Sequence, residues 1–513
     1  MEVYTEKEVC LFVGGTGTKA GVTQGGGCTR EWLLSKGCDP SALFGPDGGC
    51  VYQAMSLEID TNCMIAGSVG QFAGVEAGMF AYLYGDTISG FYEVTAVGAN
   101  YESITFGGCQ VYIETEVNVY IGGAYSSLQL ALFNSNAMSR NCWIFTNKDE
   151  VLAATAELIY AGGNVSRNTW HRAIGYNQSL SCQNGCFISD MDEGGAFYRS
   201  AEQIMQEGIG SGCKIILDGS AVGGTAVNFQ RDNMELRNIY VIGSAGYDCI
   251  QSEGGHSGHS HGLILKGCGF DGGLNGFNGI DGCDNIVFDD CRAGPNISGW
   301  GFCMQDSSLE AKSIHLSRCI ADGCTNGYRF NIPALLDGCL GRNLAVGVHG
   351  DGDTKVAGCV FYNITAAAFE LDSDKARLSV WNTIAVMNEA AQYGVFHVMS
   401  GGGSIAYENY NCFIDRLGGA AELYDENDWP VLFAPGPAGH HTLRQDPLFV
   451  HAAGGDFKLQ DTSPCVEAGR PDLCGNALHI GFYVKPDAPG SGGINPQYRN
   501  NRQYGVGRNT QYG

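Results

Sequence analysis

The sequence predicts an all-β protein built around a right-handed parallel β-helix, a solenoid in which short strands stack coil upon coil. The first observation is a phrase that repeatedly closes on cysteine, as in "GLILKGC", "NIVFDDC" and "SIHLSRC". The second is a shorter apolar phrase between these, such as "GFCM" at 301–304 and "GYRF" at 327–330. The third is that Gly, Asn and Asp separate the phrases without any helical periodicity. The cysteines recur every 20 to 28 residues, and repeats of this length are typical of a solenoid.

The repeated cysteine is predicted to point into the coil and to form a column with its copies. Equivalent residues of neighbouring strands lie about 4.8 Å apart, so a small apolar side chain suits such a column. Buried free thiols are therefore favoured over disulfides or a metal cluster. The predicted column comprises Cys268, Cys291, Cys319, Cys339, Cys359, Ile384 and Cys412.

Five segments are expected along the chain. Residues 1–70 form an irregular N-terminal anchoring segment. Residues 71–120 alternate apolar and polar side chains between glycine turns, which predicts a small antiparallel β module. Residues 121–180 hold the first rungs and a short capping helix, which would cover the exposed edge of the first coil. The parallel β-helix occupies 181–484, and an extended basic tail rich in Gly, Asn and Tyr follows at 485–513.

The acidic charge of the chain argues against several classes of partner. With 54 Asp and Glu against 29 Lys and Arg, the net charge of −25 opposes binding to nucleic acid or to an anionic membrane. No apolar run approaches the length of a membrane span, and the N-terminus lacks the basic start of a signal peptide. We therefore expect synthesis in a cytoplasm, no nucleic-acid partner and no membrane insertion.

A histidine-rich stretch, "GGHSGHSHG", is one candidate metal site. It places His256, His259 and His261 within six residues, and two imidazoles separated by one residue on an extended segment can face one ion. The alternative is a solvated loop between two strands. No other cofactor is expected, apart from a metal ion that an aspartate cluster could hold.

Aspartate clusters are the candidate catalytic groups, because paired carboxylates can act as acid and base on a glycosidic bond or bind a cation. Their alternative role is to keep an acid-rich surface soluble. A lyase would also need a basic side chain nearby, for which Arg318 and Arg329 are candidates, and Trp300 could stack on a sugar ring. The candidate carboxylates are Asp289, Asp290, Asp351, Asp353, Asp372 and Asp374.

The C-terminal tail differs in charge from the rest of the chain. It contains three arginines and no acidic residue after Asp487, and most of its large apolar side chains are tyrosines. A basic arm of this kind is expected to dock on an acidic neighbouring subunit. The predicted docking residues are Arg499, Arg502, Arg508, Tyr498, Tyr504 and Tyr512.

Two stretches resemble a known group of proteins. "IGGAYSSLQLALFNSNAMSRNCWIF" (121–145) is similar to the start of right-handed parallel β-helix proteins of phage virions, tailspike-like or head-fibre-like, and of related bacterial β-helix proteins. "QDPLFVHAAGGDFKLQDTSPCVEAGRPD…HIGFY" (445–483) is similar to the ending that many β-helix proteins share. Cys465 and Glu467 depart from that ending, which usually has an apolar residue and Asp there.

The resemblance implies a virion structural or attachment protein at the virion surface, made in the host cytoplasm. Such a subunit would be a β-helical spike, fibre or decoration that docks on other virion proteins, associates as a homotrimer and contacts host surface polysaccharide. The favoured expectation is a protein that is not an enzyme. Two alternatives stay open: a polysaccharide-degrading lyase or glycosidase, free or as a tailspike, and a bacterial surface adhesin or filament subunit.

Overall fold

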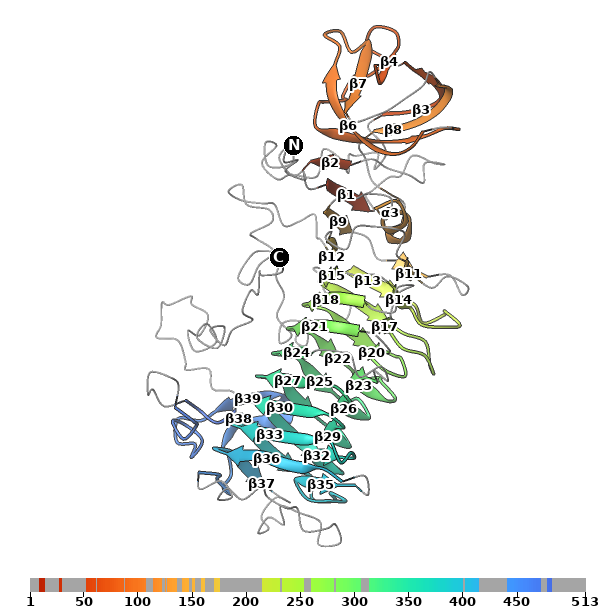
Figure 1. The fold of residues 1–513 in the computed structure, drawn as a ribbon. Helices are drawn as coiled ribbons and strands as arrows, with labels where there is room; N and C mark the ends of the chain where they lie inside the picture. The colour runs from red at the N-terminus through yellow and green to blue at the C-terminus, as the bar shows by residue number, and fades with distance from the viewer. Residues whose placement is uncertain are drawn as a thin grey trace, which may run out of the picture.

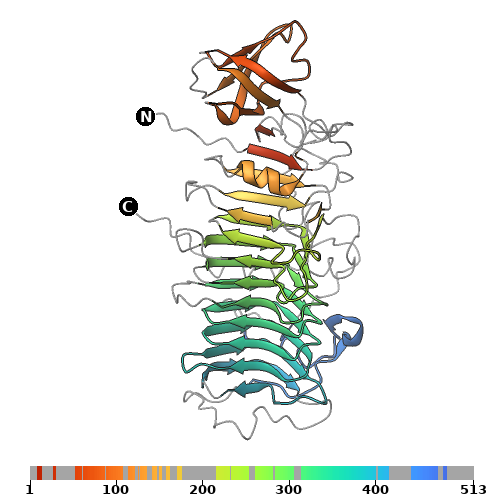
Figure 2. The same ribbon diagram turned by 90° about the vertical axis from the view of Figure 1, so that its right-hand side faces the viewer.

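The computed structural model is a nearly all-β solenoid with an antiparallel β module at one end (Figure 1). Its short strands pair in parallel with strands one coil away, which confirms the predicted parallel β-solenoid. Figure 2 shows the coils stacked beneath the module into an elongated shaft. The structure describes residues 9–13, 27–29, 52–60, 62–86, 88–107, 114–121, 125, 127–135, 141–146, 150–152, 158–161, 170–175, 215–230, 233–252, 260–280, 283–305, 313–399, 402–414, 441–471 and 478–481.

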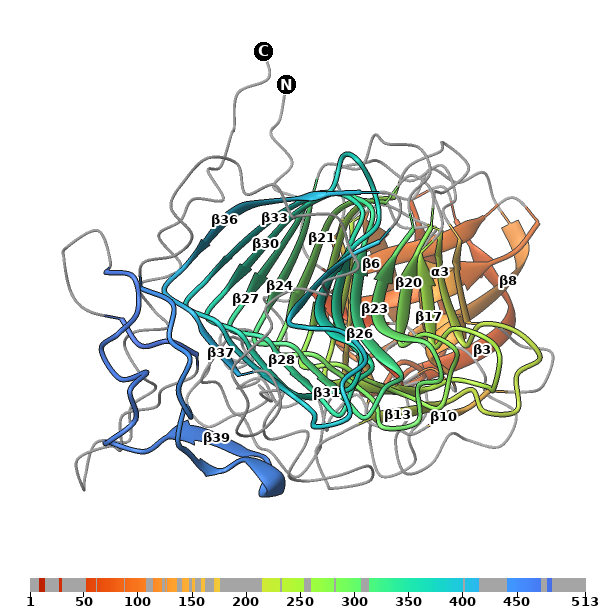
Figure 3. The ribbon, with the colours of Figure 1, turned by 90° about the horizontal axis from the view of Figure 1, so that it is seen from below.

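Each coil contributes strands to three parallel sheets, named A, B and C, which enclose the core when viewed along the axis (Figure 3). In the solenoid, sheet A contains β9 (Cys142–Thr146), β12 (His171–Gly175), β15 (Met234–Arg237), β18 (Ser260–Lys266), β21 (Cys283–Asp289), β24 (Ile314–Ser317), β27 (Ala334–Asp337), β30 (Asp353–Ala357), β33 (Arg377–Trp381) and β36 (Ser404–Asn409). Sheet B contains β10 (Glu150–Val151), β13 (Ile215–Asp218), β16 (Ile239–Ile242), β19 (Gly269–Asp271), β22 (Arg292–Ala293), β25 (Ile320–Asp322), β28 (Leu340–Arg342), β31 (Val360–Ile364), β34 (Ile384–Met387) and β37 (Cys412–Ile414). Sheet C contains β11 (Leu158–Ala161), β14 (Val227–Gln230), β17 (Ile250–Ser252), β20 (Phe277–Gly279), β23 (Trp300–Met304), β26 (Asn326–Phe330), β29 (Val346–Gly350), β32 (Ala367–Leu371) and β35 (Phe396–Val398).

The corner between sheets A and B depends on one left-handed residue in each coil. Gly267, Gly338 and Gly358 have φ of 58°, 63° and 61°, and each directly precedes a repeated cysteine. Asp290 and Arg318 hold the same position with φ of 51° and 53°. Glycine adopts this conformation without steric cost, whereas aspartate and arginine need compensating contacts.

Aromatic side chains fill the interior beside sheet C. Phe302 stacks on Tyr328, with ring centroids 5.3 Å apart, and Phe369 stacks on Phe396 at 5.2 Å. The buried Tyr328 hydroxyl lies within hydrogen-bond distance of two backbone carbonyls, those of Cys319 and Leu340. The apolar phrase noted in the sequence therefore supplies the core, and its stacking follows from the parallel register.

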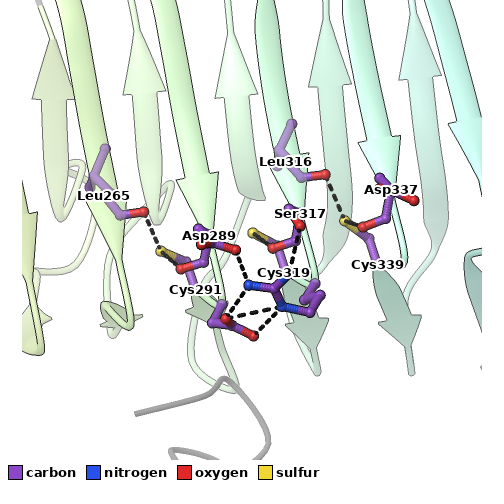
Figure 4. A network of polar contacts seen from close by, with 10 residues as sticks. Leu265, Asp289, Cys291, Leu316, Ser317, Cys319, Asp337 and Cys339 are labelled. Atoms are coloured by element: carbon purple, nitrogen blue, oxygen red, sulfur yellow. Dashed lines mark hydrogen bonds and ion pairs between the residues drawn. The ribbon is translucent and has the colours of Figure 1, made fainter. Parts of the chain in front are cut away.

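The structure places five of the repeated cysteines at successive equivalent positions. Cys268, Cys291, Cys319, Cys339 and Cys359 are all fully buried and free of disulfides. Their thiols contact backbone carbonyls, such as Leu265 O at 3.3 Å from Cys291 Sγ (Figure 4). Burial raises the pKa of the Cys319 thiol well above its ordinary value, because an apolar interior disfavours the thiolate.

The last two members of the predicted column lie elsewhere. Val360 pairs with Ile384, and Ile384 pairs with Cys412, so these residues continue the position after the cysteine. Ile384 and Cys412 belong to an apolar cluster that packs against the C-terminal segment. Thr383 and Asn411, both fully buried, continue the column instead. The difference is one residue, and in a strand a shift of one residue exchanges the inner and outer faces.

The antiparallel module begins before the predicted boundary at residue 71. Its strands β3 and β4 fall inside the segment expected to be irregular, because β3 pairs with β8 and β4 pairs with β7. β1 pairs in parallel with β9 and so precedes the first coil of sheet A. The strands of this region are β1 (Val9–Val13), β2 (Gly27–Thr29), β3 (Tyr52–Ile59), β4 (Met64–Ala66), β5 (Met79–Tyr84), β6 (Ser89–Val97), β7 (Ser103–Gly107) and β8 (Glu114–Ile121).

Short elements pack against the solenoid at its first coil and on its flank. Helix α3 (Leu128–Ser135) packs Leu128, Ala131 and Leu132 into the core next to β1, β9 and β11. Near the other end, β38 (Phe449–His451), the 3-10 helix η2 (Ala452–Gly454) and β39 (Asp456–Leu459) follow the last coil. Phe457 and Leu459 of this segment pack on the outward apolar side chains of sheet B. Among the described residues, no helix combines the length and apolar character needed to span a membrane.

Candidate functional site on the outer face of sheet C

A row of ionisable side chains follows the outer face of sheet C. Arg329, His349, Glu370 and His397 are paired in register in β26, β29, β32 and β35, which lie one below another in Figure 1. Their neighbours in each strand are apolar residues that point into the core. Because side chains alternate along a strand and parallel register repeats each coil, these four side chains form one line on the outer surface.

Glu370 joins two histidines across three coils. Its Oε2 accepts a hydrogen bond from His349 Nδ1 at 2.8 Å, and its Oε1 accepts one from His397 Nδ1 at 3.0 Å. The His349 and His397 side chains are only 7% and 9% exposed. This arrangement fixes both imidazole rings and directs the second ring nitrogen, Nε2, of His349 away from Glu370.

Two aspartates lie beside His349. Asp351 and Asp372 directly follow β29 and β32, so they occupy the same place in successive coils. His349 Nε2 lies 3.2 Å from Asp351 Oδ1, and Arg329 Nη2 lies 3.8 Å from Asp351 Oδ2. One ligand atom from each of His349, Asp351 and Asp372 lies within 4.8 Å of the others. We name these three residues the HDD cluster.

The charges of the cluster are set by these contacts. Burial opposes a charged imidazole at His349, but its hydrogen bonds to Asp351 and Glu370 outweigh burial and raise its pKa to about 9. The hydrogen bond from His349 lowers the pKa of Asp351. Burial raises the pKa of Glu370, and its hydrogen bonds to the two histidines more than offset this, so its pKa is lowered. In the absence of a bound ion, Asp351 and Glu370 are therefore anions and His349 a cation at neutral pH.

Aromatic rings flank the cluster. Trp300 contacts the edge of His349, with ring centroids 5.7 Å apart, and the Arg329 guanidinium lies 6.0 Å from the Trp300 ring. On the other side Tyr393 stacks on His397 at 3.7 Å, with the ring planes 12° apart. Trp300 and Tyr393 are both partly exposed. Flat, partly exposed rings beside polar groups are suited to packing against sugar rings.

Of each aspartate pair that the sequence suggests, the structure brings only the first member into the cluster. Asp351 and Asp372 join the cluster, whereas Asp353 and Asp374 are exposed and are not members of it. Asp353 is the first residue of β30 and so belongs to sheet A. The chain turns from sheet C to sheet A at Asp351 and Gly352, the two residues between β29 and β30.

Asp289 and Asp290 have a structural role at the corner between sheets A and B. Arg318, from the next coil, forms ion pairs with both carboxylates, and its Nε and Nη2 hydrogen-bond to Asp290 at 3.0 and 2.7 Å (Figure 4). Asp290 and Arg318 both hold the left-handed corner position of their coils without being glycine. Their ion pair provides the compensating contact that this backbone conformation requires.

Several predicted site residues lie outside the described residues. His256 and His259 are among them, as are all six predicted docking residues of the tail: Arg499, Arg502, Arg508, Tyr498, Tyr504 and Tyr512. The backbone of His261 belongs to β18, where it pairs with Asp284. The histidine loop and the docking arm therefore stay predictions.

The sequence analysis did not identify His349, Glu370, His397 or Tyr393 as site residues. The phrase "GVHG" at 347–350 was not recognised as a copy of "GYRF". Aligned by the observed register, the phrases place Cys303, Arg329, His349, Glu370 and His397 in one column. Polar residues at a single outward position of an apolar repeat would have indicated this site.

Comparisons with known proteins give a limited result. No family model matches the chain, and no curated protein matches it. Among solved structures, it is similar to the catalytic domain of a GH87 alpha-1,3-glucanase in complex with tetrasaccharides, with a TM-score of 0.32 and 11% identity. That match covers 77% of this chain and 82% of the other.

Two kinds of chemistry fit the HDD cluster and its surroundings. Asp351, whose pKa is lowered, lies close to Asp372, and paired carboxylates can act on a glycosidic bond. The same two carboxylates and the His349 imidazole also form a donor set for a divalent cation. Both chemistries act on oxygen-rich substrates and need a surface that holds the substrate beside the cluster.

Proposed function

We propose that this protein binds a polysaccharide on the outer face of sheet C and cleaves it at the HDD cluster. The observation that carries the proposal is the convergence of Asp351 and Asp372 beside His349, from two successive coils. Holding these charged side chains partly buried costs free energy, because each charge removed from water must be matched by an opposite one. Surface charges that serve only solubility do not need such matching.

The surroundings of the cluster support a sugar polymer as the substrate. Trp300 on one side and Tyr393 on the other offer two rings along the solenoid axis, with the charged groups between them. A polymer that lies parallel to the axis would meet one coil about every 4.8 Å and would contact several coils at once. Arg329, 34% exposed, is placed to contact hydroxyl or carboxylate oxygens of that polymer.

The expected virion attachment role is compatible with this site and is proposed with it. An elongated shaft with a separate module at one end suits a protein that is held at its N-terminal end and displays its flank. We propose that the other virion proteins contact the module or the basic tail, and that the subunit is a homotrimer. The resemblance of residues 121–145 to the start of phage β-helix proteins supports this role.

A panel of polysaccharides tests the proposed function. The full-length protein is incubated with capsular polysaccharides, lipopolysaccharide glycans, neutral glucans and uronate-containing polymers, in buffer supplemented with Zn²⁺ and Mn²⁺. New reducing ends are measured together with unsaturated ends, which distinguishes hydrolysis from elimination. We expect at least one polymer to be shortened. If no polymer is shortened, and none slows the protein in affinity electrophoresis, the proposed function is wrong.

A further inference from the structure

We propose that the HDD cluster is a binding site for a divalent transition-metal ion, with His349 Nε2, one Asp351 oxygen and one Asp372 oxygen as ligands. This inference deepens the proposed function, because it names the cofactor of the same site. It concerns side chains from two coils that the structure positions in full, unlike the histidine loop noted in the sequence.

The distances between the donor atoms are close to those of a metal site. The three atoms lie within 4.8 Å of one another. Ligand atoms bound at about 2.1 Å around a tetrahedral ion are separated by about 3.4 Å. Binding of one ion would therefore draw the three atoms closer together, through rotation of the two aspartate side chains. The backbone positions of Asp351 and Asp372 need no change, because parallel register already places them in neighbouring coils.

The orientation of His349 is a separate argument. Its Nδ1 is 2.8 Å from Glu370 Oε2, and the other oxygen of Glu370 is held by His397 Nδ1 at 3.0 Å. A carboxylate that accepts a hydrogen bond from one ring nitrogen fixes the imidazole so that its other nitrogen can bind a metal ion. His349 is buried, and its Nε2 lies 3.2 Å from Asp351 Oδ1, on the side of the ring away from Glu370.

The donor set indicates which metal ions fit. One imidazole with two carboxylates suits Zn²⁺ or Mn²⁺, whereas Ca²⁺ prefers six to eight oxygen ligands. Three protein ligands also leave coordination positions open to substrate or water. When bound, such an ion would act as a Lewis acid toward a substrate oxygen. Trp300, next to His349, would then form one wall of that open side.

Metal binding by the full-length protein tests the inference. The protein is treated with a chelator, dialysed against Zn²⁺, Mn²⁺ or Ca²⁺ in turn, and its metal content is measured by mass spectrometry. His349→Gln and Asp372→Asn remove one ligand each. Asp374→Asn is the matched carboxylate control, and His259→Ala controls for binding by the histidine loop. Circular dichroism verifies folding, and Asp372→Asn keeps the test valid if the buried His349 variant does not fold.

We expect about one Zn²⁺ or Mn²⁺ per chain, with at least tenfold weaker binding in both ligand variants and unchanged binding in both controls. Absence of binding, binding of Ca²⁺ alone, or loss of binding only in His259→Ala would overturn the metal site. Polysaccharide cleavage that continues in the presence of a chelator would also overturn it, while leaving the proposed function in place. Metal binding without cleavage or binding of any polysaccharide would support the metal site and contradict the proposed function.

Discussion

Replacing Asp351 by asparagine should lower the rate of polysaccharide cleavage at least about 100-fold, the loss typical when a positioned acid, base or electrostatic group is removed. Asp351 is the member of the HDD cluster that contacts both His349 and Arg329, and these contacts keep it ionised. Asparagine preserves the size of the side chain but not its charge. The prediction therefore concerns chemistry rather than packing, and the measured quantity is the initial rate of chain shortening.

Asp353→Asn is the matched control for that experiment. Asp353 lies two residues away, is exposed and belongs to sheet A, so its substitution should leave the rate within about twofold. Thermal melting of both variants would show that they remain folded. Equal rates for Asp351→Asn and the wild-type protein would place the active site elsewhere on the molecule.

Replacing Phe302 by alanine should lower the free energy of unfolding by about 3 to 5 kcal/mol, the range for truncating a fully buried phenylalanine. Phe302 is completely buried, stacks on Tyr328 at 5.3 Å and meets Phe288 edge-on at 5.3 Å. It therefore joins two consecutive coils and two sheets, and its loss leaves a cavity between them. Urea denaturation followed by circular dichroism measures the change.

Tyr247→Ala is the comparison for the buried substitution. Tyr247 is 47% exposed, so removing its ring should change the stability by less than about 1 kcal/mol. Equal decreases in the free energy of unfolding of the two variants would mean that the stacked aromatic side chains beside sheet C do not form the core of the solenoid. We expect a large decrease in the free energy of unfolding for Phe302→Ala and a small one for Tyr247→Ala.

Much of the fold could be predicted from the sequence because its repeats report directly on the coil. The cysteine phrase identifies one corner, and an αL-prone residue precedes the cysteine in most copies. The position of this left-handed residue also shows where the alignment by cysteine departs from the structure. Asn382 and Tyr410 are left-handed, so the residues that follow them, Thr383 and Asn411, continue the column. Matching apolar residues alone selected Ile384 and Cys412, one position too late.

The site was only partly predictable, because it depends on which face each residue occupies. "GDGD" and "LDSD" suggest four equivalent aspartates, yet the chain turns between the two members of each pair. Side chains alternate between the two faces of a strand, so Asp351 and Asp372, each two residues after an outward-facing residue, face the same side. His349 and Glu370 belong to the site because of their register across sheet C. The segment "GVHG" is only weakly similar to the other repeats, so the sequence did not reveal this register.

The location of bound sugar tests the central claim most directly. A crystal structure of the Asp351→Asn protein with oligosaccharides from the polymer that the panel identifies would measure this location. The account predicts sugar rings on the outer face of sheet C, between Trp300 and Tyr393 and within contact of Asp372. Sugar bound only on sheet A, on sheet B or on the N-terminal module would contradict it.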